Sequence, residues 1–427
     1  MPILSLDGRF VLFASTANNL VLTPDSNPIP VLIPPRVNVY LRDRSSHTTA
    51  LVSVNVSGNG GGNEDSLPAG LSDDGRYVLF ESAASNLIKG DTNNVTDIFV
   101  RDVLSNTTFL VSASTNGFFA NGSSRGSVIT PDGHYVAFVS EANNLVPGDT
   151  NRIADVFVRD LQVGQTTLGS ASAKSTGTTF PAGSSESPAL TPDGRYVCFY
   201  STATNLVPGV RTTGDIYVRD LSSGTTRWVS ADARASSATA LRTTNVVCYN
   251  LAISDEGRFV AYQVSAASTG FTNSLVLRYD ASSDSTEVIS SNAFYGSAAY
   301  EDVRSLDMTP DGRVIAFVAR GGPGVQGAIT TCVKVWQADT GETTLASGAL
   351  DGTLPANCVA DSPVLDRTGR YVAFTCDGTN LVAEPPSSGF HLYLRDLQSA
   401  TTMLLDADTN RIAGPISPAT FPRLSGD

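Results

Sequence analysis

One short phrase recurs along the whole chain and constrains its fold more than any other feature. It consists of an apolar run, a turn containing Asp-Gly or a close variant of it, and a second apolar run that is preceded in most copies by Arg. The clearest copies are residues 71–80, 129–138 and 190–199. The turn glycines lie at positions 8, 75, 133, 194, 257, 312 and 369, so consecutive copies are 67, 58, 61, 63, 55 and 57 residues apart. The chain of 427 residues therefore contains seven related units.

Each unit predicts four antiparallel β-strands. The first strand ends at the turn, where glycine supplies the positive φ that a tight turn requires. A second apolar strand follows, as in residues 135–139, and a third ends in Arg-Asp, as in 156–160. A Gly/Ser/Asn turn then opens a Thr-rich fourth strand, as in 166–168. No stretch shows a convincing helical period.

Units of this size and strand number are typical of β-propeller blades. One four-stranded sheet cannot cover both of its faces, whereas stacked blades cover each other, so strands such as 77–80 can be apolar on both sides. A parallel β-helix would need much shorter repeats. We therefore expect an all-β fold, a seven-bladed β-propeller of four-stranded antiparallel blades forming a single domain over residues 1–427. The expected blades are approximately 1–54, 68–114, 126–172, 187–232, 246–291, 304–348 and 361–407.

The end of the chain leaves the blade count open. Residues 416–427 repeat the first-strand phrase and stop where the next Gly-Arg would come. They are expected to form a strand that closes a seven-bladed ring by joining the first blade. In the alternative, they begin an eighth blade that is truncated.

The repeated phrase resembles the TolB-like, or WD40-like PD40, propeller repeats of bacteria. The resemblance rests on the Pro-Asp-Gly-Arg-Tyr-Val core at 192–197 and on the Asp-Ile-Tyr-Val-Arg-Asp strand at 215–220, and it extends over nearly the whole chain. It is specific for the fold and unspecific for function. Relatives include periplasmic protein-docking propellers, propeller halves of serine peptidases and exported surface proteins, so the chemistry has to come from the residues themselves.

The charge of the chain excludes several partner classes. Lys+Arg is 28 against Asp+Glu 41, a net charge of −13. Such a surface repels phosphate backbones and anionic lipids, so nucleic acid and membrane surfaces are poor partners. There is no apolar run long enough to insert into a bilayer. The first five residues lack the features of a signal peptide and read as part of a repeat, so we expect the chain to begin inside a longer, exported bacterial product located outside the cell, on its surface or in the periplasm.

Two loops carry the sharpest local motif. Residues 90–97 read Gly-Asp-Thr-Asn-Asn-Val-Thr-Asp, and residues 148–155 repeat the pattern. Their alternating side-chain oxygens resemble those of calcium loops, although the Glu that would complete an EF-hand is absent and residues 209–212 lack the pattern. Calcium is the one cofactor that the sequence predicts. The alternative is a structural turn in which the later Asp fixes the start of a strand. The candidate ligands are Asp91, Asn93, Asp97, Asp149, Asn151 and Asp155.

The cysteines predict one disulfide. Cys358 and Cys376 lie on consecutive strands of the last blade, nearly equidistant from the turn at 367–368, which makes them cross-strand neighbours. A disulfide between them would suit an exported protein. The alternative is two buried free thiols. Cys198, Cys248 and Cys332 are expected to fill the core.

Catalytic patterns are weak. Residues 122–126 match the Gly-x-Ser-x-Gly nucleophile elbow, but they lie in a connector with no helix after them, so we expect the match to be coincidental. His47, His134 and His391 fall in three different blades without metal-ligand spacing, which argues against a zinc or manganese centre. The Arg-Asp endings at 42–43, 101–102, 159–160, 219–220 and 395–396 recur at one blade position and are expected to be structural ion pairs.

These observations predict a non-enzymatic, exported binding or scaffold propeller that interacts with protein or polysaccharide, and they leave open whether calcium or a structural turn organises the loops at 90–97 and 148–155. The alternatives are a propeller enzyme that acts on glycans as a lyase or hydrolase, and a structural subunit of an extracellular assembly. The loops at 23–36, 319–331 and 384–390 break the repeat and are candidate binding loops. The sequence predicts no oligomeric state.

Overall fold

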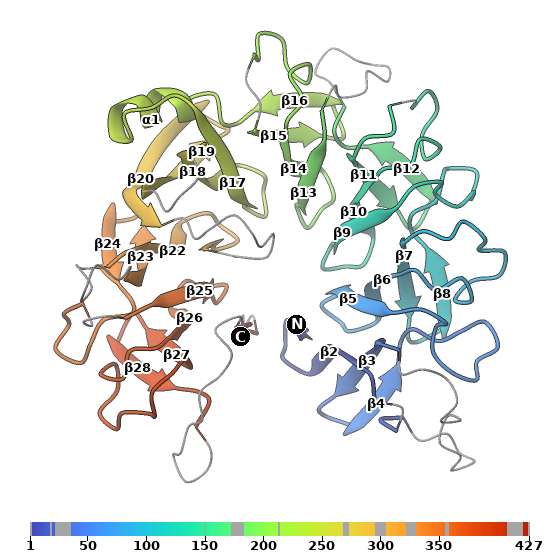
Figure 1. Ribbon diagram of the computed structural model, residues 1–427, viewed down its shortest axis with the longest axis horizontal. Helices are drawn as coiled ribbons and strands as arrows, with labels where there is room; N and C mark the ends of the chain where they lie inside the picture. The colour runs from blue at the N-terminus through green and yellow to red at the C-terminus, as the bar shows by residue number, and fades with distance from the viewer. Residues whose placement is uncertain are drawn as a thin grey trace. The chain divides into compact units, whose positions relative to one another are not determined.

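A computed structural model describes most of the chain (Figure 1). The described residues are 2–17, 19–21, 36–149, 151–171, 183–211, 214–267, 273–294, 305–321, 330–354, 358–407 and 422–425. The chain divides into two compact units. The first comprises residues 1–213 and 217–228, and the second comprises 214–216 and 229–426.

The first unit contains four blades, each with its strands hydrogen-bonded in chain order. The first two blades are β1 (Ile3–Leu4), β2 (Phe10–Ser15), β3 (Asn38–Asp43), β4 (Thr48–Leu51), β5 (Ser66–Leu71), β6 (Tyr77–Ser82), β7 (Asp97–Asp102) and β8 (Thr107–Leu110). The next two are β9 (Ser124–Ile129), β10 (Tyr135–Ser140), β11 (Asp155–Asp160), β12 (Gln165–Leu168), β13 (Ser185–Leu190), β14 (Tyr196–Ser201), β15 (Asp215–Asp220), whose first two residues belong to the second unit, and β16 (Thr225–Trp228).

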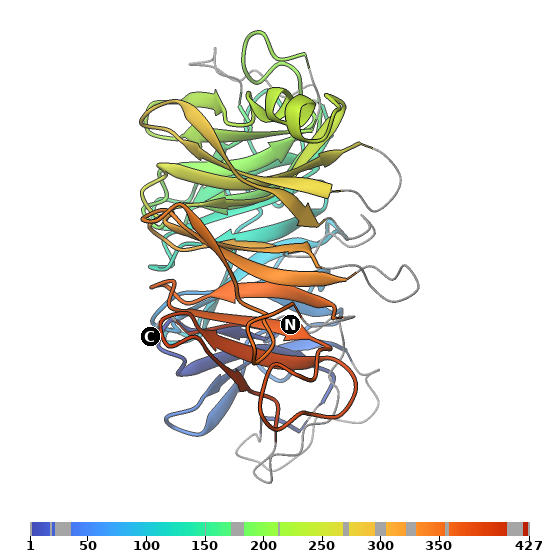
Figure 2. The same cartoon turned by 90° about the vertical axis from the view of Figure 1, so that its left-hand side faces the viewer.

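The second unit contains three further four-stranded blades and a helix. Its strands are β17 (Val246–Ile253), β18 (Phe259–Ala266), β19 (Asn273–Asp280), β20 (Ser285–Phe294), β21 (Leu306–Met308), β22 (Val314–Arg320), β23 (Thr331–Gln337), β24 (Glu342–Leu345), β25 (Ala360–Leu365), β26 (Tyr371–Cys376), β27 (His391–Asp396) and β28 (Thr401–Leu404). The fifth and sixth blades join into one sheet through the single pair Ala293–Ala319. Figure 2 shows the long strands of this unit in yellow and orange.

The predicted all-β propeller of four-stranded antiparallel blades is confirmed, and the described residues form seven such blades. Residues 422–425 contain no strand, and the rest of the expected closing strand lies outside the described residues. The single-domain prediction and the choice between a closed seven-bladed ring and a truncated eighth blade therefore stay predictions. Within the described ranges, no helix has the length and hydropathy that crossing a bilayer requires.

The helix α1 (Ala233–Ala240) was not expected from the sequence. It is the yellow-green coil in Figure 2. The segment reads Ala-Arg-Ala-Ser-Ser-Ala-Thr-Ala, so alanine, the best helix former, supplies the propensity. Because so few large apolar side chains mark a buried face, the segment carries no amphipathic stripe and reads as a loop.

The second strand of each blade forms the core, as its composition predicts. In β6, Val78, Leu79 and Phe80 are all fully buried although their side chains alternate between the two faces of the sheet. Phe80 stacks on Phe99 of β7, with ring centroids 5.5 Å apart. The outermost strands, such as β8, instead alternate between exposed and half-buried residues. Both faces of the inner strands are covered, as stacked blades require.

The glycines of the repeated turn fix how neighbouring blades pack. Gly133 has a φ of +73°, and a Cβ built on it would lie 2.3 Å from the Tyr77 ring of the preceding blade. Gly194 makes the same close approach, at 2.1 Å, to Tyr135. Only glycine combines this backbone conformation with this closeness. The turn of one blade therefore fits against the aromatic residue that follows the turn of the blade before it.

The prediction that the Arg-Asp endings are ion pairs holds for their aspartates only: each aspartate pairs with the residue after a turn glycine, whereas the arginines of the endings donate to threonine hydroxyls instead. Arg76, which follows a turn glycine, donates from Nε and Nη2 to the two carboxylate oxygens of Asp102, at 3.1 and 2.7 Å. Asp102 also accepts the N–H of Leu104 and so caps the next turn. The Arg76 guanidinium holds the pKa of Asp102 well below its usual range. The same bidentate pair recurs as Arg9–Asp43, Arg195–Asp220, Arg258–Asp280 and Arg370–Asp396.

Candidate functional site

The two predicted calcium loops each gather their residues at the start of a third strand. In the second blade, Asp97 is fully buried and accepts hydrogen bonds from Ser112 Oγ at 2.6 Å and from Asn93 Nδ2 at 2.6 Å. The N–H of Asn93 lies 3.3 Å from Asp91 Oδ1. The structure therefore brings the three predicted residues together.

The loop of the third blade repeats this arrangement. Asp155 is fully buried and accepts hydrogen bonds from Ser170 Oγ at 2.9 Å and from Asn151 Nδ2 at 3.1 Å. The N–H of Asn151 points to Asp149 Oδ1 at 3.3 Å. Because the amide nitrogen of Asn151 faces the buried carboxylate, these bonds are the ones that the structural-turn alternative requires. A cation would need the amide to turn its oxygen toward the site instead.

Burial makes these carboxylates unusual acids. It raises the pKa of Asp97 to about 6 and that of Asp155 to about 7, against the hydrogen bonds that lower them. The like charges of Asp91 and Asp149 raise these pKa values further. Among the described residues, no lysine or arginine forms an ion pair with any of the four carboxylates. Each loop therefore holds two acidic groups without a compensating cation.

Other blades have different residues and partners at the position of Asp97 and Asp155, the first residue of the third strand. In the fourth blade, Asp215 accepts Ser230 Oγ at 2.8 Å and pairs with Arg234 of α1 at 2.7 Å. In the first blade, the neutral Asn38 occupies the position and accepts Ser53 Oγ at 2.9 Å. In the fourth blade, where Asp215 has no second aspartate beside it, Arg234 neutralises its charge. In the first blade, the neutral side chain of Asn38 takes the place of the acid. The second and third blades depart from this pattern by adding a second carboxylate.

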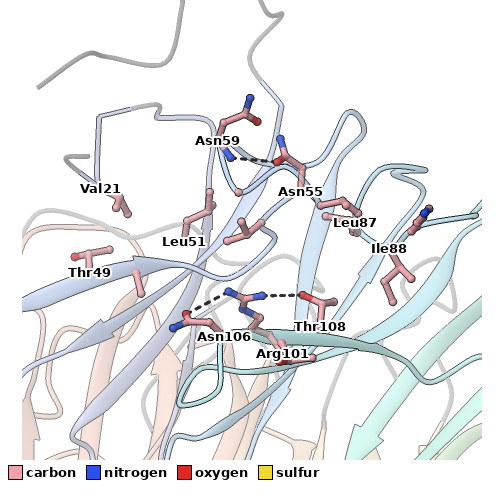
Figure 3. Close-up of a pocket in the computed structure, with 17 residues that line it drawn as sticks. Val21, Thr49, Leu51, Asn55, Asn59, Leu87, Ile88, Arg101, Asn106 and Thr108 are labelled. Atoms are coloured by element: carbon pink, nitrogen blue, oxygen red, sulfur yellow. Dashed lines mark hydrogen bonds between the residues drawn. The ribbon is translucent and has the colours of Figure 1, made fainter. Parts of the chain in front are cut away.

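A groove lies between the outer strands of the first two blades (Figure 3). Its volume is about 800 Å³. Apolar side chains that line it are Val21, Leu51, Val54, Val56, Leu87 and Ile88. Threonine and asparagine side chains supply hydrogen-bonding groups, among them Asn55, Asn59, Asn106 and Thr108. Among the described lining residues none is acidic or aromatic, whereas Lys89 and Arg101 are basic, which distinguishes the groove in a chain of net charge −13.

Arg101 is the group that sets this groove apart. Its equivalents in the next two blades are buried and donate to carbonyls of the preceding connector, Arg159 to Ala113 O at 3.2 Å and Arg219 to Ala171 O at 3.4 Å. With respect to the described part of the chain, Arg101 donates only within its own blade, to Thr108 Oγ1 at 3.2 Å and Asn106 Oδ1 at 3.3 Å, as Figure 3 shows. Burial lowers its pKa, yet a guanidinium stays charged at neutral pH.

A second, smaller cavity lies between the second and third blades. Unlike the groove with Arg101, it is lined by charged side chains that have partners. Its volume is about 350 Å³. Its lining includes the Arg76–Asp102 pair, and His134, whose Nε2 lies 3.1 Å from Asp160. Arg159 also borders it, with its guanidinium docked on the connector. The charged groups that line this cavity already have partners within the chain.

The residues considered for catalysis are engaged in the fold. Ser124, the serine of the Gly-x-Ser-x-Gly match, lies in β9, is fully buried and donates to Ser140 Oγ at 2.9 Å, and no helix follows it. His391 is fully buried, with Nδ1 3.0 Å from Asp406 and Nε2 3.0 Å from the Ser387 carbonyl. Cys358 and Cys376 are both buried free thiols in this structure, so their pairing as a disulfide stays a prediction.

The sequence missed the groove and Arg234. Arg101 has the same neighbours in sequence as Arg159 and Arg219, and only its contacts distinguish it. Arg234 lies 19 residues after Asp215, beyond the strand that carries the acid. Most of two of the irregular loops proposed for binding, residues 23–35 and 322–329, lies outside the described residues. Residues 384–390 line neither of the two cavities described above.

No protein-family model and no characterised protein matches the sequence. Solved structures do match in fold. A prolyl endopeptidase structure has 12% identity and a TM-score of 0.51, covering 95% of this chain and 49% of that chain. The propeller domain of the Trilobed protease from Pyrococcus furiosus has 12% identity and a TM-score of 0.47, covering 97% of both. TolB from Acinetobacter baumannii has 14% identity and a TM-score of 0.38, covering 79% of this chain and 63% of TolB. The chain thus spans less than two thirds of TolB and half of the endopeptidase, and at these identities the likeness is to the β-propeller fold alone.

Proposed function

We propose that this chain is a non-enzymatic, exported binding propeller whose first two blades hold a peptide segment bearing a carboxylate. The observation that carries the proposal is Arg101, a charged and partly desolvated guanidinium in a groove without a described acidic residue. A partly buried guanidinium pairs most favourably with a planar carboxylate, which it binds through two parallel hydrogen bonds. Membership of the TolB-like repeat family is part of the same proposal and rests on the repeated phrase.

The lining favours a peptide over a polysaccharide. Sugar rings are commonly held by stacking on Trp or Tyr, and neither is among the described residues that line the groove. Leu51, Val54 and Leu87 instead provide apolar walls, and the Asn59 side chain offers an amide group suited to peptide N–H and C=O groups. The volume falls within the range of small-ligand sites and would take a few residues of extended peptide.

Calcium binding in the loops of the second and third blades is a further part of the proposal. Each loop holds two buried or nearly buried carboxylates and an asparagine side chain, which are oxygen ligands that hard cations prefer. The blade comparison supports it, because Asp215 at the corresponding position has Arg234 as its cationic partner. In this proposal the ions stabilise the blades, and the groove binds the partner.

The two alternatives rest on less. A glycan lyase or hydrolase needs a pair of carboxylates or a metal set that faces a cleft, and neither described cavity contains a carboxylate without a cationic or structural partner. A structural subunit would expose large apolar patches, and the described cavities and ion pairs supply no observation that favours this alternative.

The groove is tested by changing Arg101 to Gln. Loss of a charge-assisted hydrogen bond should weaken the binding of a carboxylate-bearing peptide by about tenfold to a hundredfold. A library of short peptides with free or amidated C-termini and with acidic or neutral side chains supplies the probes, and fluorescence anisotropy measures the affinity. The matched control is Arg395→Gln, because Arg395 makes the same contact, to Thr402 Oγ1 at 3.0 Å, in the last blade.

The proposal fails if no peptide of the library binds, or if Arg101→Gln and Arg395→Gln bind equally well. Binding of acidic polysaccharides in preference to every peptide would move the function to the glycan class. Turnover of such a glycan by the purified protein would show that the non-enzymatic assignment is wrong.

A further inference from the structure

Three metal-ligating side chains converge at one end of the last blade. Atoms of Cys358, Cys376 and Asp377 that can ligate a metal all lie within 4.8 Å of one another. Cys376 ends β26, and Cys358 lies two residues before Ala360, the residue that pairs with Cys376 across the sheet. The antiparallel register therefore places the two sulfur atoms side by side, and the residue after Cys376 adds the carboxylate.

Gly378 allows the two sulfur atoms to meet. A Cβ on Gly378 would lie 3.2 Å from the Sγ atom of both cysteines and 2.8 Å from Leu381. The absence of a side chain thus leaves both sulfurs facing one glycine. The Gly378 N–H also donates to Cys376 Sγ at 3.2 Å. A backbone N–H that points at sulfur stabilises the thiolate, which is the form that ligates metals.

Asp377 is held in place by the backbone of the neighbouring strand. Its Oδ1 accepts the Val359 N–H at 2.6 Å, which fixes the carboxylate beside Cys358. Asp377 is half-buried, whereas Cys358 and Cys376 are 2% and 0% exposed. The carboxylate therefore lies between the buried sulfurs and the solvent.

Three groups that become anionic on deprotonation are thereby gathered in one place. The Cys358 thiol, burial and the Asp377 charge together raise the pKa of Cys376 above its ordinary value. A disulfide between the two cysteines would not use the Asp377 carboxylate. A bound cation would use it as a ligand, and the positive charge would neutralise the two thiolates and the carboxylate. We propose that Cys358, Cys376 and Asp377 form a binding site for a thiophilic divalent cation, with Zn²⁺ as the best match.

The ligand set selects the metal class. Two thiolates exclude the hard cations Ca²⁺ and Mg²⁺, and a mixed sulfur and oxygen set is one that Zn²⁺ accepts in tetrahedral geometry. Three protein ligands would leave the fourth position of a tetrahedral ion to water or another ligand. Binding exchanges two thiol protons for one cation, and the protons leave to solvent, so affinity should fall as the pH falls. The inference is independent of the groove and of calcium.

The test uses the full chain, reduced and freed of metal, with Co²⁺ and Zn²⁺ as probes. One equivalent of Co²⁺ should produce the near-ultraviolet charge-transfer band of a cobalt thiolate, and Zn²⁺ should remove the band and raise the melting temperature. Cys358→Ala and Cys376→Ala should each lose the band. Cys248→Ala, a buried cysteine in another blade of the same unit, is the matched control and should keep it.

The Asp377→Asn variant should stay folded, because asparagine can still accept the Val359 N–H through its side-chain oxygen. A loss of metal binding in this variant therefore reports on the site and not on misfolding. The variant should leave the melting temperature in chelator unchanged and weaken Co²⁺ binding. The absence of a band in reduced wild-type protein overturns the proposal, as does a band that survives both alanine substitutions. Mass spectrometry of protein purified without reductant adds another check: a Cys358–Cys376 disulfide would show that the pair serves as a cross-link, not as a metal site.

Discussion

In chelator, the free energy of unfolding of this protein should fall as the pH rises from about 4 to about 7, and calcium should reverse the fall. The cause is the burial of Asp97 and Asp155, whose pKa rises from 3.8 to about 6 and about 7 in the folded state. A carboxyl whose pKa is raised by folding stabilises the fold below its unfolded pKa, and this stabilisation is lost as the pH passes through the folded pKa. With about 1.4 kcal/mol per pKa unit, the contribution is on the order of 3 kcal/mol for Asp97 and 4 kcal/mol for Asp155.

Calcium acts on the ionised form of the same residues. At pH 8 both carboxyls are charged, so a bound cation replaces the proton as the neutralising group and the melting temperature should rise. At pH 5, where protons compete for Asp97 and Asp155, calcium should have a smaller effect. Differential scanning calorimetry across this pH range, with and without calcium, measures both trends.

The control variants are Asp97→Asn and Asp155→Asn, made together. Asn38 shows that asparagine fits this position and accepts the serine hydroxyl just as aspartate does. The double variant should have a shallower profile between pH 4 and pH 7, because Asp91, Asp149, Asp255 and Asp361 keep raised pKa values, and it should show no response to calcium. A falling profile in the wild type without any calcium effect would favour the structural turn over the metal site. A flat wild-type profile would contradict the buried-carboxylate argument itself.

Replacing Arg234 by Gln should destabilise the protein by about 3–5 kcal/mol, because the change leaves a buried carboxylate without its cation. Asp215 is fully buried, and Arg234 donates to its two oxygens at 2.7 and 3.2 Å. The second substitution Asp215→Asn should restore most of the loss, since the remaining amide needs no counter-charge. Chemical denaturation of the two single variants and the double variant measures this coupling.

A loss of less than about 1 kcal/mol in Arg234→Gln, which is typical of surface ion pairs, would show that solvent reaches Asp215. Additive effects of the two substitutions would show that the pair is not coupled. Either result would also weaken the blade comparison that supports calcium in the second and third blades.

The repeat was sufficient to predict the blades, because glycine and aspartate recur where the backbone needs them. Each Asp-Gly turn predicted the boundary between a first and a second strand, and the apolar runs predicted the strands buried on both faces. The turn arginine was the unpredicted partner of the Arg-Asp ending, since Arg76 and Asp102 are 26 residues apart. Helix α1 escaped prediction because alanine and serine mark no buried face.

The candidate sites show where sequence reasoning reaches its limit. The loop residues Asp91, Asn93 and Asp97 follow from their spacing, but the raised pKa of Asp97 depends on burial by the assembled blade. The groove has no sequence signal at all, because Arg101 differs from Arg159 only in the contacts it makes. Cys358 and Cys376 were predicted as neighbours, while the third ligand came from the turn that places Asp377 beside them.

The close approach of Gly133 to Tyr77, and of Gly194 to Tyr135, has an evolutionary consequence. Gly75 and Gly312 make the same approach to Phe10 and Phe259, whereas Gly369 approaches Val314. A copy of the repeat that has both the turn glycine and an aromatic residue two positions later therefore contains both halves of the contact. A tandem gene duplication of such a blade would therefore supply a compatible neighbour on either side without any further mutation. Loss of one glycine, in contrast, would break a contact shared by two blades, so selection on that codon acts on a pair of repeats at once.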